Sequence, residues 1–194
     1  VSLSPYYLQL PQCSISSNPY GGATGTYGLL GCLAIQHSGT WAVVMFYYQS
    51  GVKGVILGIQ VGQYPTSLSG DFVPWAYIGT NGYLHVGDAD FPNNGFSLPL
   101  SPGWHTLIVG EYFSGGTYYL VAYLDSTSNG QSISTASLPY LFGGFGATNP
   151  YDDIGTGYTG SVWPNTPGGW FFYNGIIAYV AFFPGGASVG NYLA

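Results

Sequence analysis

Residues 103–125 decide the fold class of this chain; they read Gly-Trp-His-Thr-Leu-Ile-Val-Gly-Glu-Tyr-Phe-Ser-Gly-Gly-Thr-Tyr-Tyr-Leu-Val-Ala-Tyr-Leu-Asp. Two runs rich in β-branched and aromatic residues, 106–113 and 117–124, flank the triplet Ser114-Gly115-Gly116. A Gly-Gly pair tolerates the positive φ angles that a tight turn between antiparallel strands requires. The stretch therefore predicts a β-hairpin.

Neither face of this hairpin is cleanly polar. Side chains alternate along a strand, so Leu107 and Val109 share one face while Ile108 and Tyr112 share the other. A strand with one solvated face would show polar residues at every second position. We therefore expect the hairpin to be covered on both sides, in a central position within a two-layer sandwich.

The rest of the chain repeats a pattern of short strands separated by turns. Apolar, β-branched and aromatic runs are bounded by Gly, Pro, Asn or Ser, which is typical of strands joined by turns. We expect strands at residues 29–35, 41–49, 55–61, 75–78, 83–86 and 173–183. Residues 126–137 and 143–169 are expected to be connections, with a short apolar piece at 138–142. Because no segment shows the periodicity of a capped helix, the sequence predicts an all-β sandwich or barrel.

The chain divides into an arm and one domain. At 194 residues it is long enough for one well-filled β domain, which we place at residues 25–194. Residues 1–24 form an extended N-terminal arm and linker, in which apolar and polar residues tend to alternate. The chain begins without methionine, so we expect either a removed signal peptide or a trimmed chain. The arm residues expected to contact another subunit are Val1, Ser2, Leu3, Tyr6, Tyr7, Leu8 and Leu10.

Charge is almost absent from this sequence. Charged residues make up 4% of the chain, and Lys53 is the sole Lys or Arg, whereas an ordinary soluble protein has about 25% charged residues. Nucleic acid is excluded as a partner because phosphate binding needs clustered basic side chains. Anionic membrane surfaces are excluded for the same reason. The apolar runs 41–48 and 176–183 are far shorter than the roughly 18 residues of a membrane-spanning helix, so we expect no membrane insertion.

Cysteine usage indicates an extracellular protein. Cys13 and Cys32 are the only cysteines, and an even pair in a Gly- and Tyr-rich chain is typical of a disulfide formed in an oxidising compartment. The alternative is two buried free thiols, since free cysteine is often buried.

The order of features resembles a known family. Gly103-Trp104-His105-Thr106-Leu107, a Gly turn and Tyr118 to Asp125 are similar to the "W-H-x-h … L-Y-V-D-G" hairpin of concanavalin A-like, laminin-G-type jelly rolls. Residues 172–183 followed by Ser188 resemble that family's closing strand. The resemblance covers about residues 27–188 and implies a two-sheet antiparallel jelly-roll sandwich.

Two departures from the family pattern concern the surface. Ser126 stands where the family usually has Gly, and Ala178 and Ala181 replace polar positions of the last strand. Those positions would face solvent in a free-standing domain. Their apolar replacement predicts a covered outer face.

Catalytic chemistry is poorly supported. The family includes glycoside hydrolases, which need two positioned carboxylates, but Glu111 is the only Glu. A pairing of Glu111 with Gln49 or Gln60 would rest on residue type alone. The three His residues have the surroundings of structural residues, and no Gly-x-Ser-x-Gly motif occurs. We expect a protein without catalytic residues.

Two sets of residues have the chemistry of ligand-binding groups. Asp88, Asp90, Asp152 and Asp153 form two pairs of hard oxygen ligands suited to Ca²⁺, although the alternative is that they are turn residues and solvated acids. Trp163 and Trp170 lie in a Pro- and Gly-rich loop, where aromatic rings would suit carbohydrate. For Trp41 and Trp104 we expect core packing instead. No cofactor is required, and Ca²⁺ is optional.

These observations favour a non-enzymatic structural subunit of an extracellular assembly, such as an archaeal or bacterial surface filament. Low charge leaves little repulsion between copies, and the arm would be donated as a strand to the sheet edge of a neighbouring copy, so the partner is the chain itself. One alternative is a secreted, lectin-like carbohydrate-binding module, in which Ca²⁺ would assist. A second alternative is a viral capsid or shell protein.

Overall fold

The computed structural model describes residues 28–29, 41–60, 72–87, 95–115, 117–126, 130–135, 151–160 and 163–183. All regular elements in these residues are β-strands, which confirms the all-β prediction. The described ranges contain no helix that is long and apolar enough to cross a membrane. The predicted arm and linker (1–24), Cys13, Cys32, Asp88 and Asp90 lie outside the described residues.

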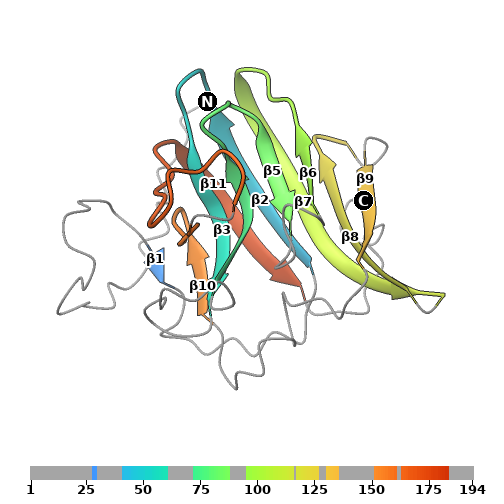
Figure 1. The fold of residues 1–194 in the computed structure, drawn as a ribbon. Helices are drawn as coiled ribbons and strands as arrows, with labels where there is room; N and C mark the ends of the chain where they lie inside the picture. Colours follow the sequence, from blue (N-terminus) through green and yellow to red (C-terminus); the bar gives the residue numbers. More distant parts are fainter. Residues whose placement is uncertain are drawn as a thin grey trace.

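The strands form two antiparallel sheets (Figure 1). The six-stranded sheet has the order β1 (Gly28–Leu29), β10 (Tyr151–Ile154), β3 (Gly54–Gln60), β4 (Phe72–Ile78), β5 (Leu84–Gly87) and β6 (Gly95–Leu98). The five-stranded sheet has the order β11 (Ile176–Phe183), β2 (Trp41–Tyr48), β7 (Gly103–Ser114), β8 (Thr117–Leu124) and β9 (Gly130–Thr135). The two-sheet antiparallel architecture is thus as predicted.

The predicted hairpin is the centre of the five-stranded sheet. Strands β7 and β8 pair from Leu107 opposite Leu124 to Ser114 opposite Thr117, and Gly115 in the turn has a φ of 59°. Such a positive φ is readily adopted by glycine, which has no Cβ. Strand β2 pairs along the other side of β7, so β7 has a neighbour on each side.

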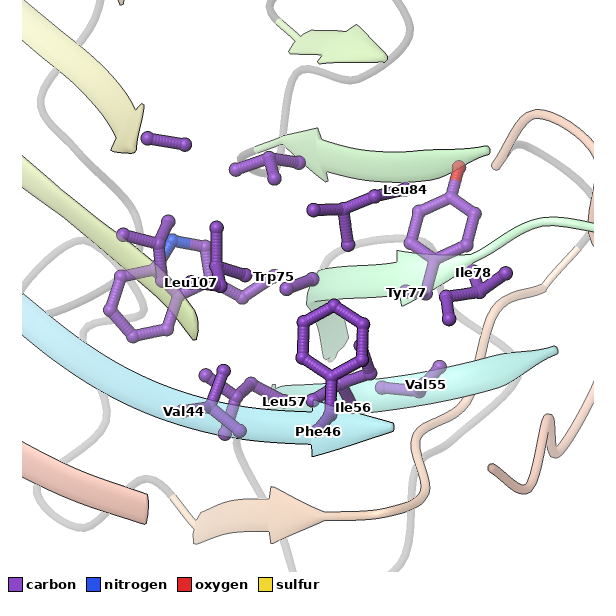
Figure 2. Packing of buried hydrophobic residues seen from close by; sticks show 14 of the residues in the cluster. Val44, Phe46, Val55, Ile56, Leu57, Trp75, Tyr77, Ile78, Leu84 and Leu107 are labelled. Atoms are coloured by element: carbon purple, nitrogen blue, oxygen red, sulfur yellow. The ribbon is translucent and has the colours of Figure 1, made fainter. Parts of the chain in front are cut away.

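The main core gathers side chains from both sheets (Figure 2). Val44 and Phe46 of β2 and Leu107 of β7 are fully buried there, together with Ile78 and Leu84 of the six-stranded sheet. In β2 the buried residues Ala42, Val44 and Phe46 alternate with more accessible ones. Buried and accessible residues alternate in this way when one face of a strand packs on the core and the other face points outward.

A second buried cluster lies on the other face of the five-stranded sheet. It contains Trp41, Ile108 and Val121, with Val43 and Tyr123 packed against it. Ile108 pairs with Val43 on one side and with Tyr123 on the other, so these side chains share one face. The cluster shows that the β7–β8 hairpin buries apolar side chains on both faces, as its sequence predicts.

Residues 155–174, here called the C-terminal hairpin, join the six-stranded sheet to β11. Backbone hydrogen bonds link Tyr173 N to Gly155 O, Phe171 N to Gly157 O and Thr159 N to Gly169 O. The hairpin returns to β3, where Val55 N donates to Phe171 O. The Tyr173 hydroxyl donates to Tyr47 O of β2 at 2.6 Å, which ties the hairpin to the other sheet.

The close approach of the C-terminal hairpin to β3 depends on glycine. Gly54 has a φ of 119°, and a Cβ added there would overlap with the backbone carbonyl of Phe172. On the preceding residue, Lys53 N donates to the Asn174 side chain at 2.7 Å and Lys53 O accepts from Asn174 N at 3.1 Å. The chain is therefore clamped at residues 53 and 54.

Three strands were not predicted from the sequence. Strand β9 lies within the expected connection 126–137, and β10 lies within the expected loop 143–169. Their sequences, Gly-Gln-Ser-Ile-Ser-Thr and Tyr-Asp-Asp-Ile, contain strand-favouring Ile, Thr and Tyr but no continuous apolar run. They are strands because β8 and β3 offer them pairing partners. The short strand β6 was missed for lack of a clear apolar run.

We predict that Gly54→Ala lowers the free energy of unfolding by at least about 3 kcal/mol, because it combines a positive φ with a backbone overlap. Gly51→Ala is the matched control: it has a φ of 89° but meets nothing within 4 Å of an added Cβ. Its cost should be about 1 kcal/mol, from backbone strain alone. Urea unfolding followed by tryptophan fluorescence measures both. Equal losses in the two variants would contradict this account of the contact.

Candidate functional site

The candidate site is the outward face of the five-stranded sheet, on the side away from the main core. The register aligns its side chains in rows across three strands. One row contains Ile176 of β11, Tyr47 of β2 and Trp104 of β7; the next contains Tyr179, Met45 and Thr106. Side chains at paired positions lie on the same face and touch their neighbours. Aromatic and aliphatic groups thus form a continuous surface.

Exposed apolar side chains of the described chain are concentrated here. Ile176 is 58% exposed, Tyr179 53%, Trp104 49% and Met45 39%. The other large apolar side chain exposed in the described ranges is Tyr83, which lies outside these rows. The rings of Tyr47 and Trp104 meet edge to face at 5.4 Å. We call Met45, Tyr47, Trp104, Ile176 and Tyr179 the exposed apolar patch.

The strands that carry the patch have almost no charge. Strands β2, β8, β9 and β11 contain no Asp, Glu, Lys or Arg, and β7 contains only Glu111. A partner at this surface would therefore meet apolar groups and few ions. Contiguous exposed apolar surface of this kind marks interaction sites on soluble proteins.

The buried His105 fixes the end of β7 beside the patch through two contacts. His105 Nδ1 lies 2.7 Å from Asp125 Oδ2, and His105 Nε2 lies 2.7 Å from the Ser101 carbonyl oxygen. Both partner atoms are oxygen acceptors. Asp125 also accepts from Thr106 N at 2.8 Å. Because His105 points inward, alternation turns Trp104 outward.

The expectation that Trp104 packs in the core is wrong, whereas Trp41 is buried as expected in the second cluster. Trp104 is the neighbour of an inward residue, His105, and therefore belongs to the outward set with Thr106 and Ile108. The sequence already indicates this orientation, because the alternation that assigns the two faces of the hairpin places Trp104 on the face opposite His105. The outward positions of β2 and β11, Met45 and Tyr179, were not singled out because an apolar residue in a strand normally reads as core.

A second polar cluster surrounds His85 on the six-stranded sheet. Tyr77, His85 and Ser97 are paired across β4, β5 and β6, and the Tyr77 and His85 rings stack at 4.9 Å. His85 Nε2 donates to Asn81 Oδ1 at 3.1 Å, and the Ser97 hydroxyl donates to Nδ1 at 2.8 Å. These partners suit a neutral ring. Burial lowers the pKa of His85 to about 4 and raises the pKa of the Tyr77 hydroxyl.

The two tryptophans predicted for carbohydrate contact differ in accessibility. Trp163 is 4% exposed and lies edge to face with Tyr77, whose hydroxyl donates to Pro164 O. Its ring therefore belongs to the main core. Trp170 is partly exposed and lies between Tyr158 and Phe172, with the Phe172 ring at an angle of 21° and 6.3 Å away.

The predicted metal ligands are distributed between described and undescribed parts. Asp152 and Asp153 belong to strand β10, opposite Ile59 and Gly58, whereas the sequence placed them in a loop. Asp153 is buried. Within the ranges that the structure describes, no group of three or more His, Cys, Asp or Glu side chains is placed to hold a metal ion. The pair Asp88 and Asp90 lies outside those ranges.

Comparison of the sequence with protein-family models and with curated proteins found no match.

We predict that His85 makes the fold acid-sensitive. Its pKa falls from 6.5 to about 4 on folding, so the unfolded chain binds the proton first as the pH decreases. The stabilising contribution is complete above pH 6.5 and is lost as the pH falls toward 4, by about 3 kcal/mol in total. Urea unfolding at several pH values measures this loss.

The control for this prediction is His85→Gln, which keeps an amide in place of the imidazole but has no proton to gain. Its free energy of unfolding should change less between pH 7 and pH 4.5 than that of the wild type. If both proteins lose the same amount, His85 does not cause the acid sensitivity.

Proposed function

We propose that this chain is a non-enzymatic structural subunit of an extracellular assembly. In this proposal, jelly-roll subunits polymerise into a surface filament, each donating its N-terminal strand to the next copy. The observation that carries the proposal is the exposed apolar patch, which lies on strands with almost no charge. A subunit whose apolar surface is buried against its neighbours can have such a patch. A monomeric domain in water instead depends on charges spread over its surface to prevent association.

The five-stranded sheet carries apolar side chains on both faces, and this supports the same proposal. Its inner face belongs to the main core, and its outer face carries both the second cluster and the exposed patch. The apolar area is therefore larger than the core between the two sheets can bury. Contact between copies would bury the remainder, and identical uncharged surfaces meet without repulsion.

The strand order supports the jelly-roll part of the proposal. The first long strand, β2, lies beside the last strand, β11, and the other strands follow as antiparallel neighbours β3 to β6 and β7 to β9. The residues that carry the family resemblance are also connected, since His105 Nδ1 and Asp125 Oδ2 are in hydrogen-bond contact across the hairpin. In this scheme residues 1–24 are the extended arm and the remaining residues are the sandwich domain.

One observation favours the carbohydrate-binding alternative. Trp170 and Phe172 are nearly parallel and partly exposed on the C-terminal hairpin, and adjacent aromatic faces suit the apolar side of a sugar ring. By contrast, the edge-to-face arrangement of Tyr47 and Trp104 offers no common flat surface. The shell alternative depends on the same apolar surfaces, because subunits of a closed shell would also bury them against one another.

Electron microscopy and light scattering of the intact chain test the proposal. We expect filaments whose mass rises with protein concentration, and deletion of residues 1–10 should leave shorter species. A finer comparison in the full chain uses Leu8→Lys with Leu10→Lys against Gln9→Lys. Charges at apolar arm positions should reduce polymer mass strongly, because those side chains would be buried on donation. Gln9→Lys should have a smaller effect.

A clean monomer at millimolar concentration would overturn the assembly proposal. Monomers that bind oligosaccharide, with binding lost in Trp170→Ala, would establish the carbohydrate-binding alternative. Closed particles of uniform size would establish the shell alternative.

We predict that Met45→Lys weakens self-association while leaving stability nearly unchanged. Met45 is exposed at the centre of the patch, and a charge there opposes burial against another copy. The control is Tyr83→Lys, since Tyr83 is comparably exposed but lies outside the patch. Sedimentation velocity should show less association for Met45→Lys only, with unfolding free energies within about 0.5 kcal/mol of wild type in both. If the two variants associate to the same extent, the exposed apolar patch is not the interface between copies.

A further inference from the structure

We infer that the acceptor for the donated N-terminal strand is the edge of β11 that no described strand covers. This inference rests on the proposed function and adds to it the surface of the neighbouring copy on which the arm docks. The expected product is a five-stranded sheet extended by one strand from another subunit.

The two sheets have four edge strands within the described residues: β1, β6, β9 and β11. Strands β1 and β6 have two and four residues, so each offers few backbone N–H and C=O groups to an added strand. Strand β9 has six residues but is mostly polar, reading Gly-Gln-Ser-Ile-Ser-Thr. Strand β11 has eight residues and reads Ile-Ile-Ala-Tyr-Val-Ala-Phe-Phe. It is therefore the long apolar edge of the described structure.

Within the described residues, strand β11 has little of the usual protection of an edge. Natural edge strands are shielded by Lys, Pro, short length or bulges, because an open ladder of N–H and C=O groups pairs with other chains. Strand β11 has no Lys or Pro. It has one register irregularity, between Ile177 and Tyr179, but its pairing with β2 is regular from Tyr179 to Phe183. Ile176, Ala178 and Tyr179 are exposed along it. Among the described strands, β2 is the one that pairs with it.

The arm has the length and chemistry to complete this edge. Ten extended residues span about 33 Å, and the eight residues of β11 span about 26 Å. Residues 1–10, Val-Ser-Leu-Ser-Pro-Tyr-Tyr-Leu-Gln-Leu, carry no side-chain charge, so burial of the arm against β11 leaves no side-chain ion unpaired. Main-chain hydrogen bonds supply affinity in strand addition, and alternate side chains supply specificity.

Docking at β11 would also cover part of the exposed apolar patch. Ile176 and Tyr179 belong to the rows that continue through β2 to β7. A strand added beside β11 extends those rows by one position, at a spacing of about 4.8 Å. Addition at β9 would leave both side chains as they are, because β9 is at the opposite edge of the sheet.

Photo-crosslinking in the full chain tests this inference. A benzophenone amino acid replaces Tyr7, and equal amounts of ¹⁴N- and ¹⁵N-labelled subunits are assembled and irradiated. Peptic digestion is suitable, because the chain has a single Lys or Arg. We expect mixed-isotope peptides that join the arm of one subunit to residues 176–183 of another.

A pair of edge variants gives a second measurement in the full chain. Ala178→Lys places a charge on the exposed β11 edge, and Ser132→Lys places the same charge on β9. We expect Ala178→Lys to reduce the intermolecular crosslink by at least about tenfold, since charged side chains on an edge oppose strand addition. Ser132→Lys should leave it within about twofold. Circular dichroism of both variants confirms that they remain folded.

The outcomes separate this inference from the proposed function. Assemblies whose crosslinks lead to β6 or β9, or that join β11 to β11 of another copy, overturn the β11 acceptor while the assembly stands. Crosslinks within one subunit show that the arm pairs in its own sheet and overturn strand donation. Failure of the unmodified chain to assemble overturns both proposals.

Discussion

The structure depends on the burial of both faces of the five-stranded sheet. Its central strand, β7, sends Leu107 and Val109 into the main core and Ile108 into the second cluster with Trp41 and Val121. Because neither face of this sheet is polar, exposure of either face to water is unfavourable. The six-stranded sheet covers one side, whereas on the other side burial is complete only near Trp41 and gives way to exposed apolar groups near Trp104.

Much of this architecture could be predicted from local sequence. The β7–β8 hairpin follows from two apolar runs around a Gly-Gly turn, and β2, β3, β4, β5 and β11 follow from runs of the same kind. Strands β9 and β10 could not be predicted in this way, because Ser, Gln and Asp gain their extended conformation from pairing with β8 and β3. Pairing partners distant in sequence are not visible in local composition.

The candidate surface could be predicted only in part. Alternation identifies which residues share a face, but it does not say which face another layer covers. Trp104 illustrates this limit: alternation places it on the face opposite His105, but only the structure shows that this face is exposed at Trp104. The two histidines show a similar limit: His85 has a hydroxyl donor on one ring nitrogen, whereas His105 faces two acceptors. These different partners come together only in the folded structure.

The clamp at residues 53 and 54 has a consequence for proteolysis. Trypsin cleaves after Lys or Arg, and Lys53 is the sole residue of either type, so the Lys53–Gly54 bond is the single tryptic site in the sequence. Asn174 binds the backbone of Lys53 on both its N–H and its carbonyl, and Gly54 lies against the Phe172 backbone. A protease that needs an extended, accessible segment cannot seat this bond while the C-terminal hairpin is in place. For enzymes of this specificity, resistance to digestion is a property of the folded state, and it ends when the hairpin separates from β3.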